Sequence, residues 1–198
     1  MNQNRNRLVL LLIFFLFATP VVTATLMHTS WWPYQPDETV NRGLLVEPTQ
    51  PLDYSVLAFG DGIAPPLGKW AVVYPLASPC LSPCMANVES LRQIHRATGR
   101  RQNMLAIVPL LAESEPSTAV DTLLEIYPAF YPALDGGGSV AGQLAQIGDR
   151  TPDGEQIEGQ AFLVDPSGNI MMRYAAGFDP RDLNKDLKRL LKWSAQDG

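Results

Sequence analysis

The chain has few of several residue types and patterns, and each scarcity excludes or limits a class of function. Its 198 residues include only two cysteines and two histidines, and they contain no internal repeat and no coiled-coil heptad. Positive charge is also scarce: without Arg5 and Arg7, 13 basic residues face 20 acidic ones, a net charge of −7. Because such a surface repels phosphates and no basic stripe offsets it, nucleic acid is excluded as a partner.

One long apolar run stands near the N-terminus. Residues 8–27, LVLLLIFFLFATPVVTATLM, carry no charge, and about 20 apolar residues suffice to cross a bilayer as a helix. Arg5 and Arg7 precede the run, and apart from His28 the first charge after it is Asp37. The positive-inside rule therefore predicts a single-pass protein of the inner membrane, with residues 1–7 in the cytoplasm and the C-terminal part in the periplasm.

A cleaved signal peptide is the alternative interpretation of this run. Residues 8–17 would form its apolar core, and Val22, Thr23 and Ala24 resemble a cleavage site of small residues. The apolar run continues past that site, which favours a retained anchor.

A proline-rich segment follows the predicted anchor. Residues 28–53 hold four prolines and little periodicity, so we expect an extended tether between the membrane and one domain over residues 54–198. Trp31, Trp32 and Tyr34 lie close to the predicted membrane exit. Their position is typical of an aromatic belt at the membrane interface, as is that of His28 nearby.

Beyond residue 53 the apolar pattern alternates between strand-like and helix-like spacing, and an irregular stretch rich in glycine and proline covers residues 128–159. We expect Asp179 to cap the last helix, with Pro180 at its first position. We predict strands over 54–60, 69–77 and 103–111, helices over 85–98, 117–128 and 179–193, and a hairpin of 161–165 with 169–176. This order implies a layered α/β domain with a mixed sheet.

Both cysteines fall in one turn, SPCLSPC, where the first strongly apolar strand meets its helix. Cys80 and Cys84 could form a soft-metal clip, a redox-active dithiol or an inert structural disulfide. At a helix start the dipole and the unpaired N–H groups favour the thiolate, the form that attacks disulfides and binds Cu(I). One helical turn also brings the two sulfurs within reach of each other. A disulfide that closes so short a loop contributes little entropy, which disfavours a purely structural role.

The element order, with GKWAVVYPLASPCLSPC before a helix and FLVDPSGNIMMRY near the end, resembles the thioredoxin superfamily. Within it, the anchor, the GKW lead-in and the three residues between the cysteines are most similar to the Sco/SenC copper-protein family. The resemblance covers about residues 54–195, and residues 41–45 and 48–52 also resemble small anchored proteins of bacterial cytochrome oxidase assembly. It implies a thioredoxin-like fold, a central mixed sheet flanked by helices, behind one transmembrane helix.

The resemblance also implies a function. The protein would assist cytochrome c oxidase assembly by thiol–disulfide exchange with, or copper delivery to, a client copper site such as that of oxidase subunit two. Cys80, nearer the loop tip, would be the attacking thiolate and Cys84 the resolving one. Its partners would be an oxidase subunit or another assembly factor, together with the membrane.

Two alternatives stay open. One is a copper metallochaperone that binds Cu(I) through Cys80, Cys84 and an unidentified third ligand. The other is a structural assembly factor whose cysteines are vestigial and whose surface, including residues 128–159, binds the partner.

The chain departs from both families at the positions that complete their sites. The histidine that completes the copper site of Sco proteins would fall near Ile157, where none stands, and the carboxylates of Glu155 and Glu158 are poor ligands for a cuprous ion. The cis-proline of thioredoxin-like oxidoreductases would fall at Gly159.

The remaining histidine and the methionines offer few substitutes. His95 lies eleven residues after Cys84, about 16 Å along the helix, too far to share an ion. We expect His95 to be a partly buried helix residue. Met85 is the only methionine that adjoins the cysteines.

Overall fold

The computed structural model describes residues 3–27, 41–112, 118–148 and 157–194. The chain divides into two compact units, residues 1–40 and 41–198. Helix α1 (Gln3–Met27) forms the first unit. It includes a segment, Asn6–Leu26, with a mean hydropathy of 2.5 and no buried part, which is long and apolar enough to cross a membrane. The N-terminal helix predicted from the apolar run is therefore present.

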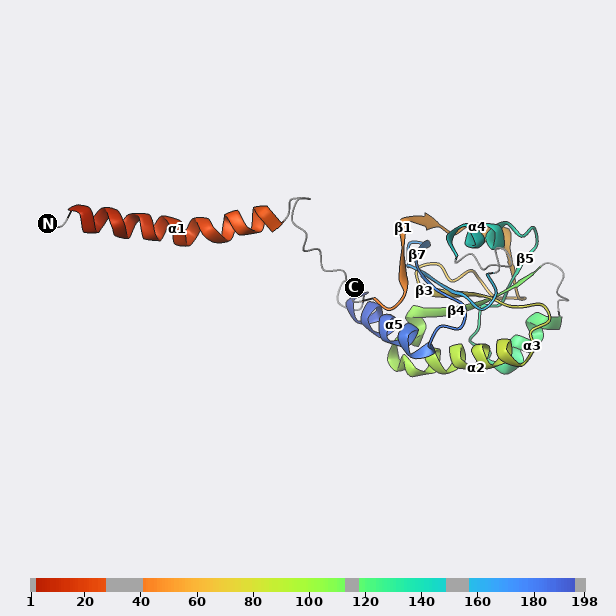
Figure 1. Ribbon diagram of the computed structural model, residues 1–198. Coiled ribbons are helices and arrows are strands. Elements are labelled where there is room, and N and C mark those ends of the chain that lie inside the picture. Colours follow the sequence, from red (N-terminus) through yellow and green to blue (C-terminus); the bar gives the residue numbers. More distant parts are fainter. Residues whose placement is uncertain (1–2, 28–40, 113–117, 149–156, 195–198) are drawn as a thin grey trace. The chain divides into compact units, whose positions relative to one another are not determined.

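The second unit is built on one mixed sheet of seven strands (Figure 1). Strands β3, β4 and β5 run parallel, and the other pairings are antiparallel. In spatial order the strands are β1 (Leu44–Pro51), β7 (Asn169–Tyr174), β6 (Ala161–Val164), β3 (Trp70–Pro75), β4 (Leu105–Ala112), β5 (Ala133–Asp135) and β2 (Leu57–Phe59). The predicted α/β class with a central mixed sheet is confirmed.

The two central strands are buried on both faces, as their continuous apolar runs predict. Every residue of β3 is buried, and only the last residue of β4, Ala112, is exposed. Val72 and Tyr74 point into one core cluster, while Ala71 and Val73 point into the other. This alternation of side chains along β3 fixes the strand between two layers of helices and loops.

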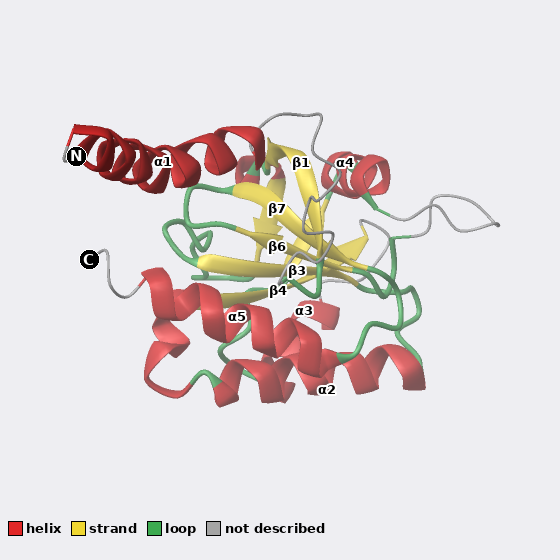
Figure 2. Cartoon of the chain, turned by 60° about the vertical axis from the view of Figure 1, so that its left-hand side comes forward, coloured by secondary structure: helices red, strands yellow, loops and turns green. Residues whose placement is uncertain are grey.

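Three helices cover one face of the sheet and one covers the other (Figure 2). Helices α2 (Ser82–Ala97), α3 (Thr118–Ile126) and α5 (Pro180–Ser194) pack on the first face, and α4 (Ser139–Ile147) packs on the second. Two short 3-10 helices, Tyr54–Val56 and Gly99–Met104, complete the fold. Helix α5 begins as predicted, because the carboxylate of Asp179 accepts a hydrogen bond from Arg181 N at 2.8 Å.

The predicted tether is too long at its C-terminal end. The compact unit begins at Asn41, and residues 44–51 form strand β1, which pairs with β7 at the edge of the sheet. The sequence of β1 does not alternate between apolar and polar residues as a half-buried strand would, because only Val46 of the strand is buried. The remainder of the predicted tether, residues 28–40 with His28, Trp31, Trp32 and Tyr34, lies outside the described residues.

The stretch predicted to be irregular, 128–159, holds two further elements. Strand β5 lengthens the parallel part of the sheet, and α4 buries Val140 and Leu144 against the second face. Gly138, with a φ of 64°, lies in the left-handed region and turns the chain into α4. The glycine-rich sequence thus marks the tight turn before a helix, and it does not mark a long loop.

Candidate functional site

The two cysteines are joined in a disulfide at the start of α2. Their Cα atoms are 5.2 Å apart, within the range that disulfides require. Cys80 lies in the loop that follows β3, and Cys84 lies in the first turn of α2. Both side chains are half-buried, so they pack against the core and still face solvent. The convergence of the two sulfurs, expected from their spacing, is present.

The start of α2 is electrostatically suited to a thiolate. Its N-cap residue is Leu81, which has no polar atom with which to cap the first turn. Pro83, in the first turn, has no N–H group, and the other N–H groups of that turn have no capping bond from the side chain of the N-cap residue. The helix dipole therefore acts on the two sulfurs without a competing capping side chain, which stabilises a thiolate once the bond is reduced.

A hydrogen bond fixes this end of α2 to the sheet. Asn87, one turn after Cys84, donates from Nδ2 to the hydroxyl of Tyr74 on β3 at 2.8 Å. Burial raises the pKa of Tyr74, although the hydrogen bond from Asn87 acts in the opposite direction. A neutral tyrosine on β3 therefore holds the first turns of α2, which carry Cys84, against the sheet. This pair was not predicted from the sequence. The alternation of side chains along β3, which places Tyr74 on the same face as Val72, is the signal that could have indicated it.

An apolar groove borders the disulfide. Its volume is about 190 Å³, and both Cys80 and Met85 line it, together with Leu76 just after β3, Leu111 of β4 and Leu123 of α3. Leu81, between the cysteines, is 66% exposed, and Met85 is 38% exposed. The sulfur atoms are thus framed by apolar surface that a partner protein could cover.

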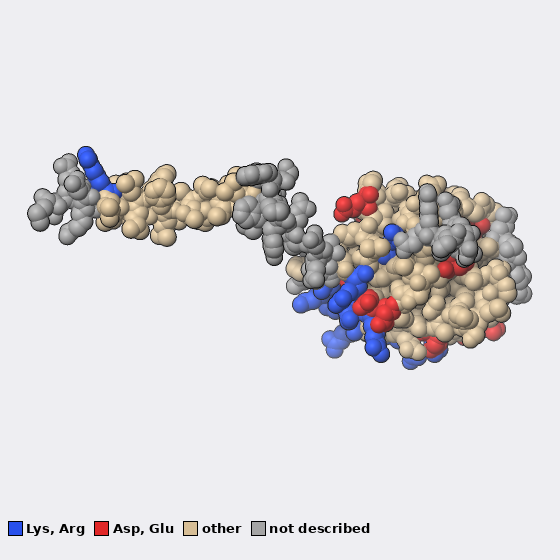
Figure 3. Space-filling model, in the orientation of Figure 1, with Lys and Arg blue, Asp and Glu red and all other residues tan. Residues whose placement is uncertain are grey.

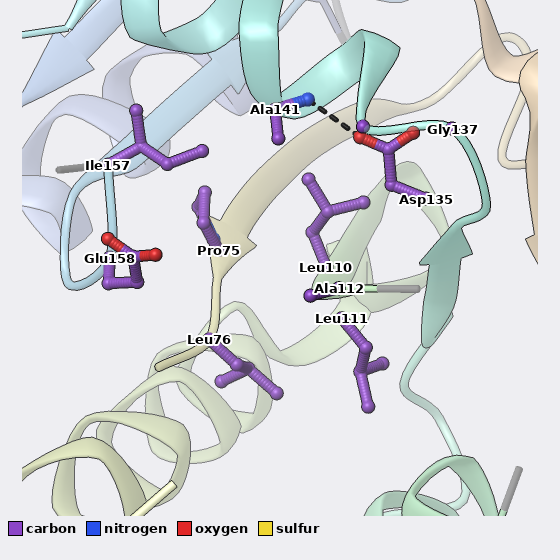
Figure 4. A pocket seen from close by; sticks show the side chains of 11 residues that line it. Pro75, Leu76, Leu110, Leu111, Ala112, Asp135, Gly137, Ala141, Ile157 and Glu158 are labelled. Atoms are coloured by element: carbon purple, nitrogen blue, oxygen red, sulfur yellow. Dashed lines mark hydrogen bonds between the residues drawn. The ribbon is translucent and has the colours of Figure 1, made fainter. Parts of the chain in front are cut away.

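A larger hollow adjoins this groove at the same edge of the sheet (Figure 4). Its volume is about 570 Å³, and it shares Leu76 and Leu111 with the groove beside the disulfide. Its wall includes Asp135, whose Oδ2 accepts a hydrogen bond from Ala141 N at 2.7 Å, and Glu158. The two hollows therefore meet at Leu76 and Leu111, and the larger one has an acidic side chain on each of two opposite walls, Asp135 and Glu158.

The loop before the β6–β7 hairpin contacts the end of β3 beside the cysteine loop. Gly159 donates from its backbone N–H to the carbonyl of Pro75 at 3.3 Å, and it has a φ of 80°. A side chain at this position would lie 3.9 Å from the hydroxyl of Tyr74. The position predicted to correspond to the cis-proline of oxidoreductases is therefore next to the strand that leads to the cysteines, and its left-handed backbone requires glycine.

Comparison with known proteins places the chain in a family. Residues 70–194 match the family described as transmembrane-like, thioredoxin-like, C-terminal domain. The chain belongs to this thioredoxin-like family. No curated protein matches it.

Solved structures share the thioredoxin-like fold. Yeast Sco1 with copper bound has a TM-score of 0.50 at 16% identity, over 64% of this chain and 78% of that one. Bradyrhizobium japonicum ScoI with copper bound has a TM-score of 0.50 at 15% identity, over 74% and 98%. A thioredoxin-family thiol:disulfide interchange protein from Chlorobium tepidum has a TM-score of 0.49 at 19% identity, over 64% and 82%. The predicted resemblance to thioredoxin-like and Sco-type proteins is confirmed at the level of the fold.

The described residues of this thioredoxin-like domain bring no histidine to the cysteines to complete a three-coordinate copper centre. Among the residues that the structure describes, no three histidine, cysteine, aspartate or glutamate side chains converge on a point where an ion could bind. Ile157, at the position expected for the Sco histidine, is a buried core residue. Glu158 is exposed in the adjoining hollow, and Glu155 lies outside the described residues. Met85 is the soft side chain that shares the groove with Cys80.

His95, which its distance from Cys84 along the helix had ruled out as a ligand, serves the fold. It is 4% exposed, its Nδ1 lies 2.8 Å from the hydroxyl of Tyr127, and its Nε2 lies 3.0 Å from the carbonyl of Leu105. Burial lowers its pKa below the usual value, against the opposing effect of the backbone hydrogen bonds. His95 is a helix residue as predicted, but it is fully buried where partial burial was expected.

Proposed function

We propose that the protein is a membrane-anchored thiol–disulfide exchange protein that acts on cysteines of a client protein on the outer side of the membrane. The observation that supports this proposal best is the Cys80–Cys84 pair at the uncapped start of α2, beside an apolar groove. Accessible cysteines at the start of a helix are typical of catalytic thiols, whereas inert disulfides lie buried in apolar surroundings.

The proposed reaction runs from the dithiol to the disulfide. The thiolate of Cys80 attacks one sulfur of a client disulfide, forms a mixed disulfide and releases the other client sulfur as a thiolate. The thiolate of Cys84 then attacks the sulfur of Cys80, which forms the intramolecular disulfide and releases the second client thiolate. Two electrons pass to the client, and an exported dithiol donor returns two electrons to the pair. Pro79 and Pro83 stiffen the loop, which keeps the two sulfurs close after reduction.

The apolar surface beside Cys80 would bind the client during this exchange. A mixed disulfide lasts only while the client chain is held next to the sulfur, and the groove lined by Leu76, Met85 and Leu111 offers contacts for apolar client side chains. The client belongs to the proposal and rests on the resemblance to Sco-type proteins: the copper-ligating cysteines of a respiratory oxidase subunit, kept reduced so that they can take up metal.

Trapping separates the roles of the two cysteines. In cells that carry Cys84→Ser, the mixed disulfide between Cys80 and the client should accumulate, because the resolving thiol is missing; it should appear as a band on a non-reducing gel that reductant removes. Cys80→Ser, the matched control in the same loop, should trap nothing. Equal trapping by both variants would contradict the assigned roles.

A redox titration tests the mechanism itself. The couple should have a midpoint above about −300 mV, the value below which structural disulfides typically lie. A midpoint well below that value, together with normal oxidase assembly in a Cys80→Ser strain, would remove the exchange mechanism. A structural assembly factor would then be the better account.

A further inference from the structure

The solvent-facing side of α5 carries a concentration of positive charge that the acidic composition conceals. No basic stripe was expected from the sequence, and the structure corrects this expectation. Lys and Arg side chains gather over α5 (Figure 3). The basic residues of the helix, all on its solvent side, are Arg181, Lys185, Lys188, Arg189 and Lys192. At 3.6 residues per turn they fall within about 100° of arc, opposite the buried leucines.

Few acidic side chains offset this charge. Asp186 is buried, and Asp182 is shared between Lys185, at 3.2 Å, and Arg42, at 4.0 Å. Within the part of the chain that the structure describes, Lys188 and Lys192 are in no recorded ion pair. The basic face of α5, defined by the five residues above, thus presents a net positive surface on a domain that is negative as a whole.

A large aromatic residue stands at the edge of this basic face. Trp193 is 65% exposed at the last turn of α5, although the helix buries its leucines. Its helical position lies between Arg189 on one side and Asp186 on the other. An exposed tryptophan beside lysines is typical of surfaces that meet the headgroup region of a membrane.

The chain enters the compact unit on the same flank of α5. The backbone N–H groups of Arg42 and Gly43 donate to Oδ2 of Asp186 at 2.8 and 3.0 Å, and the hydroxyl of Tyr174 donates to the same oxygen at 2.9 Å. Only residues 28–40 separate this point from the end of α1. Thirteen residues reach about 45 Å at most, so a membrane-inserted α1 keeps this flank near the bilayer at a high local concentration.

The opposite end of the domain carries the cysteines. Ser194, at the end of α5, accepts a hydrogen bond from Trp70 Nε1 at 2.9 Å, and Trp70 begins β3. The disulfide follows the other end of β3, which is about 17 Å away along the strand. A surface contacted through the C-terminal end of α5 would therefore leave the disulfide open to a client.

From these placements we propose that the basic face of α5, with Trp193 at its edge, docks on anionic lipid headgroups of the membrane that α1 spans. The charge complementarity, the interfacial tryptophan and the entry of the chain beside Asp186 each favour a lipid surface as the occupant. The inference rests on the membrane insertion of α1 and not on the cysteine chemistry, so either proposal can fail without the other.

The test uses the full chain in lipid nanodiscs of phosphatidylcholine, with or without phosphatidylglycerol. Amide exchange of α5 should be slower in the anionic discs, and the protection should be lost in 1 M salt, where the Debye length falls to about 3 Å. Each lysine near an anionic surface changes the docking equilibrium about fivefold. The triple replacement by Gln of Lys185, Lys188 and Lys192 should therefore lower the ratio of docked to undocked domain about 100-fold. The matched variant with Arg at these three positions keeps the charge and should dock as the parent does.

Trp193 supplies an independent readout. The fluorescence of Trp193 is the difference between the emission of the parent and that of Trp193→Phe. Lipids brominated near the headgroup should quench this difference in anionic discs and leave it unquenched in neutral ones. Leu81→Ser, at the far end of the domain, should leave both signals unchanged. Equal exchange of α5 and equal quenching in the two kinds of disc would overturn the proposal and leave the basic face to an acidic protein partner.

Discussion

His95 shows how a single residue with catalytic potential can be committed to the fold. Its Nε2 faces the carbonyl oxygens of Leu105 and Gln102, at 3.0 and 3.2 Å, so this nitrogen carries the hydrogen and donates. Nδ1 then accepts from the hydroxyl of Tyr127. The neutral ring thereby satisfies both nitrogens at the junction of α2, α3 and β4, and burial opposes its protonation.

This arrangement makes stability depend on pH in a defined direction. The pKa of His95 is lowered in the folded state, whereas in the unfolded chain it is about 6.5. Below that pH the unfolded chain therefore binds more protons than the folded one. The contribution is fully present above that pH and is lost as the pH falls towards the folded pKa, at up to about 1.4 kcal/mol per pH unit. Urea unfolding at pH 7 and 5.5 should show this loss in the parent chain and much less of it in His95→Gln.

The other histidine provides the control for this measurement. His28→Gln removes a histidine outside the compact unit, so it should keep the pH dependence of the parent. An equal slope for the parent and for His95→Gln would contradict the assignment of the pH effect to His95.

Among the elements, those with a strong local pattern could be predicted and those defined by distant contacts could not. Strands β3 and β4, helices α2 and α5, and the β6–β7 hairpin carry their signal in apolar spacing, caps and a turn, and the structure contains them all. Strand β1 buries one residue of its own and is positioned by β7, whose sequence lies far from it: Leu44 pairs with Arg173 and Pro51 with Asn169. Helix α4 follows three glycines, whose turn only the structure identifies.

The same distinction applies to the candidate site. The disulfide could be predicted because Cys80 and Cys84 are one turn apart, but the groove beside them combines Leu76, Leu111 and Leu123, which lie far apart in the sequence. The contacts of Asp186 with Arg42 and Gly43 bridge 144 and 143 residues. No local spacing encodes such contacts, because they depend on the register of the sheet and the packing of α5 on it.

Strand β1 should be required for a stable domain. A fragment of residues 54–198 lacks β1, exposes the edge of β7 and loses the burial of Val46 and Leu52, about 4 kcal/mol by side-chain transfer. It also leaves Asp186 with one of its three hydrogen-bond donors. We expect a fragment of residues 41–198 to unfold cooperatively in urea and the shorter fragment to be less stable by several kcal/mol or to aggregate.

A point variant isolates the share of Asp186 in this effect. In the fragment of residues 41–198, Asp186→Asn replaces a charged acceptor by a neutral one and should cost about 1–3 kcal/mol. Similar stability of the two fragments would show that β1 is dispensable and that the domain begins where the apolar pattern alone places it.

At the scale of the whole molecule, charge is separated along the chain. Arg5 and Arg7 lie in the first turns of α1, before its apolar run, the compact unit is acidic overall, and five of its exposed basic residues lie on α5. This distribution links the orientation of the anchor to the orientation of the domain. Under the positive-inside rule the N-terminal arginines would hold the anchor in one direction, and the proposed docking of α5 would turn the domain so that the disulfide faces away from the lipid.

The orientation and the retention of α1 can be tested in one experiment on intact cells. The apolar run continues to Met27, beyond the small residues at 22–24, so signal peptidase should leave the chain whole and the protein should stay in the membrane fraction. Protease added to spheroplasts should digest the compact unit and leave a small membrane-embedded fragment that begins at the N-terminus. Replacing Arg5 and Arg7 by Glu removes the positive flank and should protect part of the population from the protease, because the chain can then insert in the opposite direction. A mature chain that begins near Thr25 and leaves the membrane on washing would show that α1 is a signal peptide, and the tethered docking of α5 would then lose its basis.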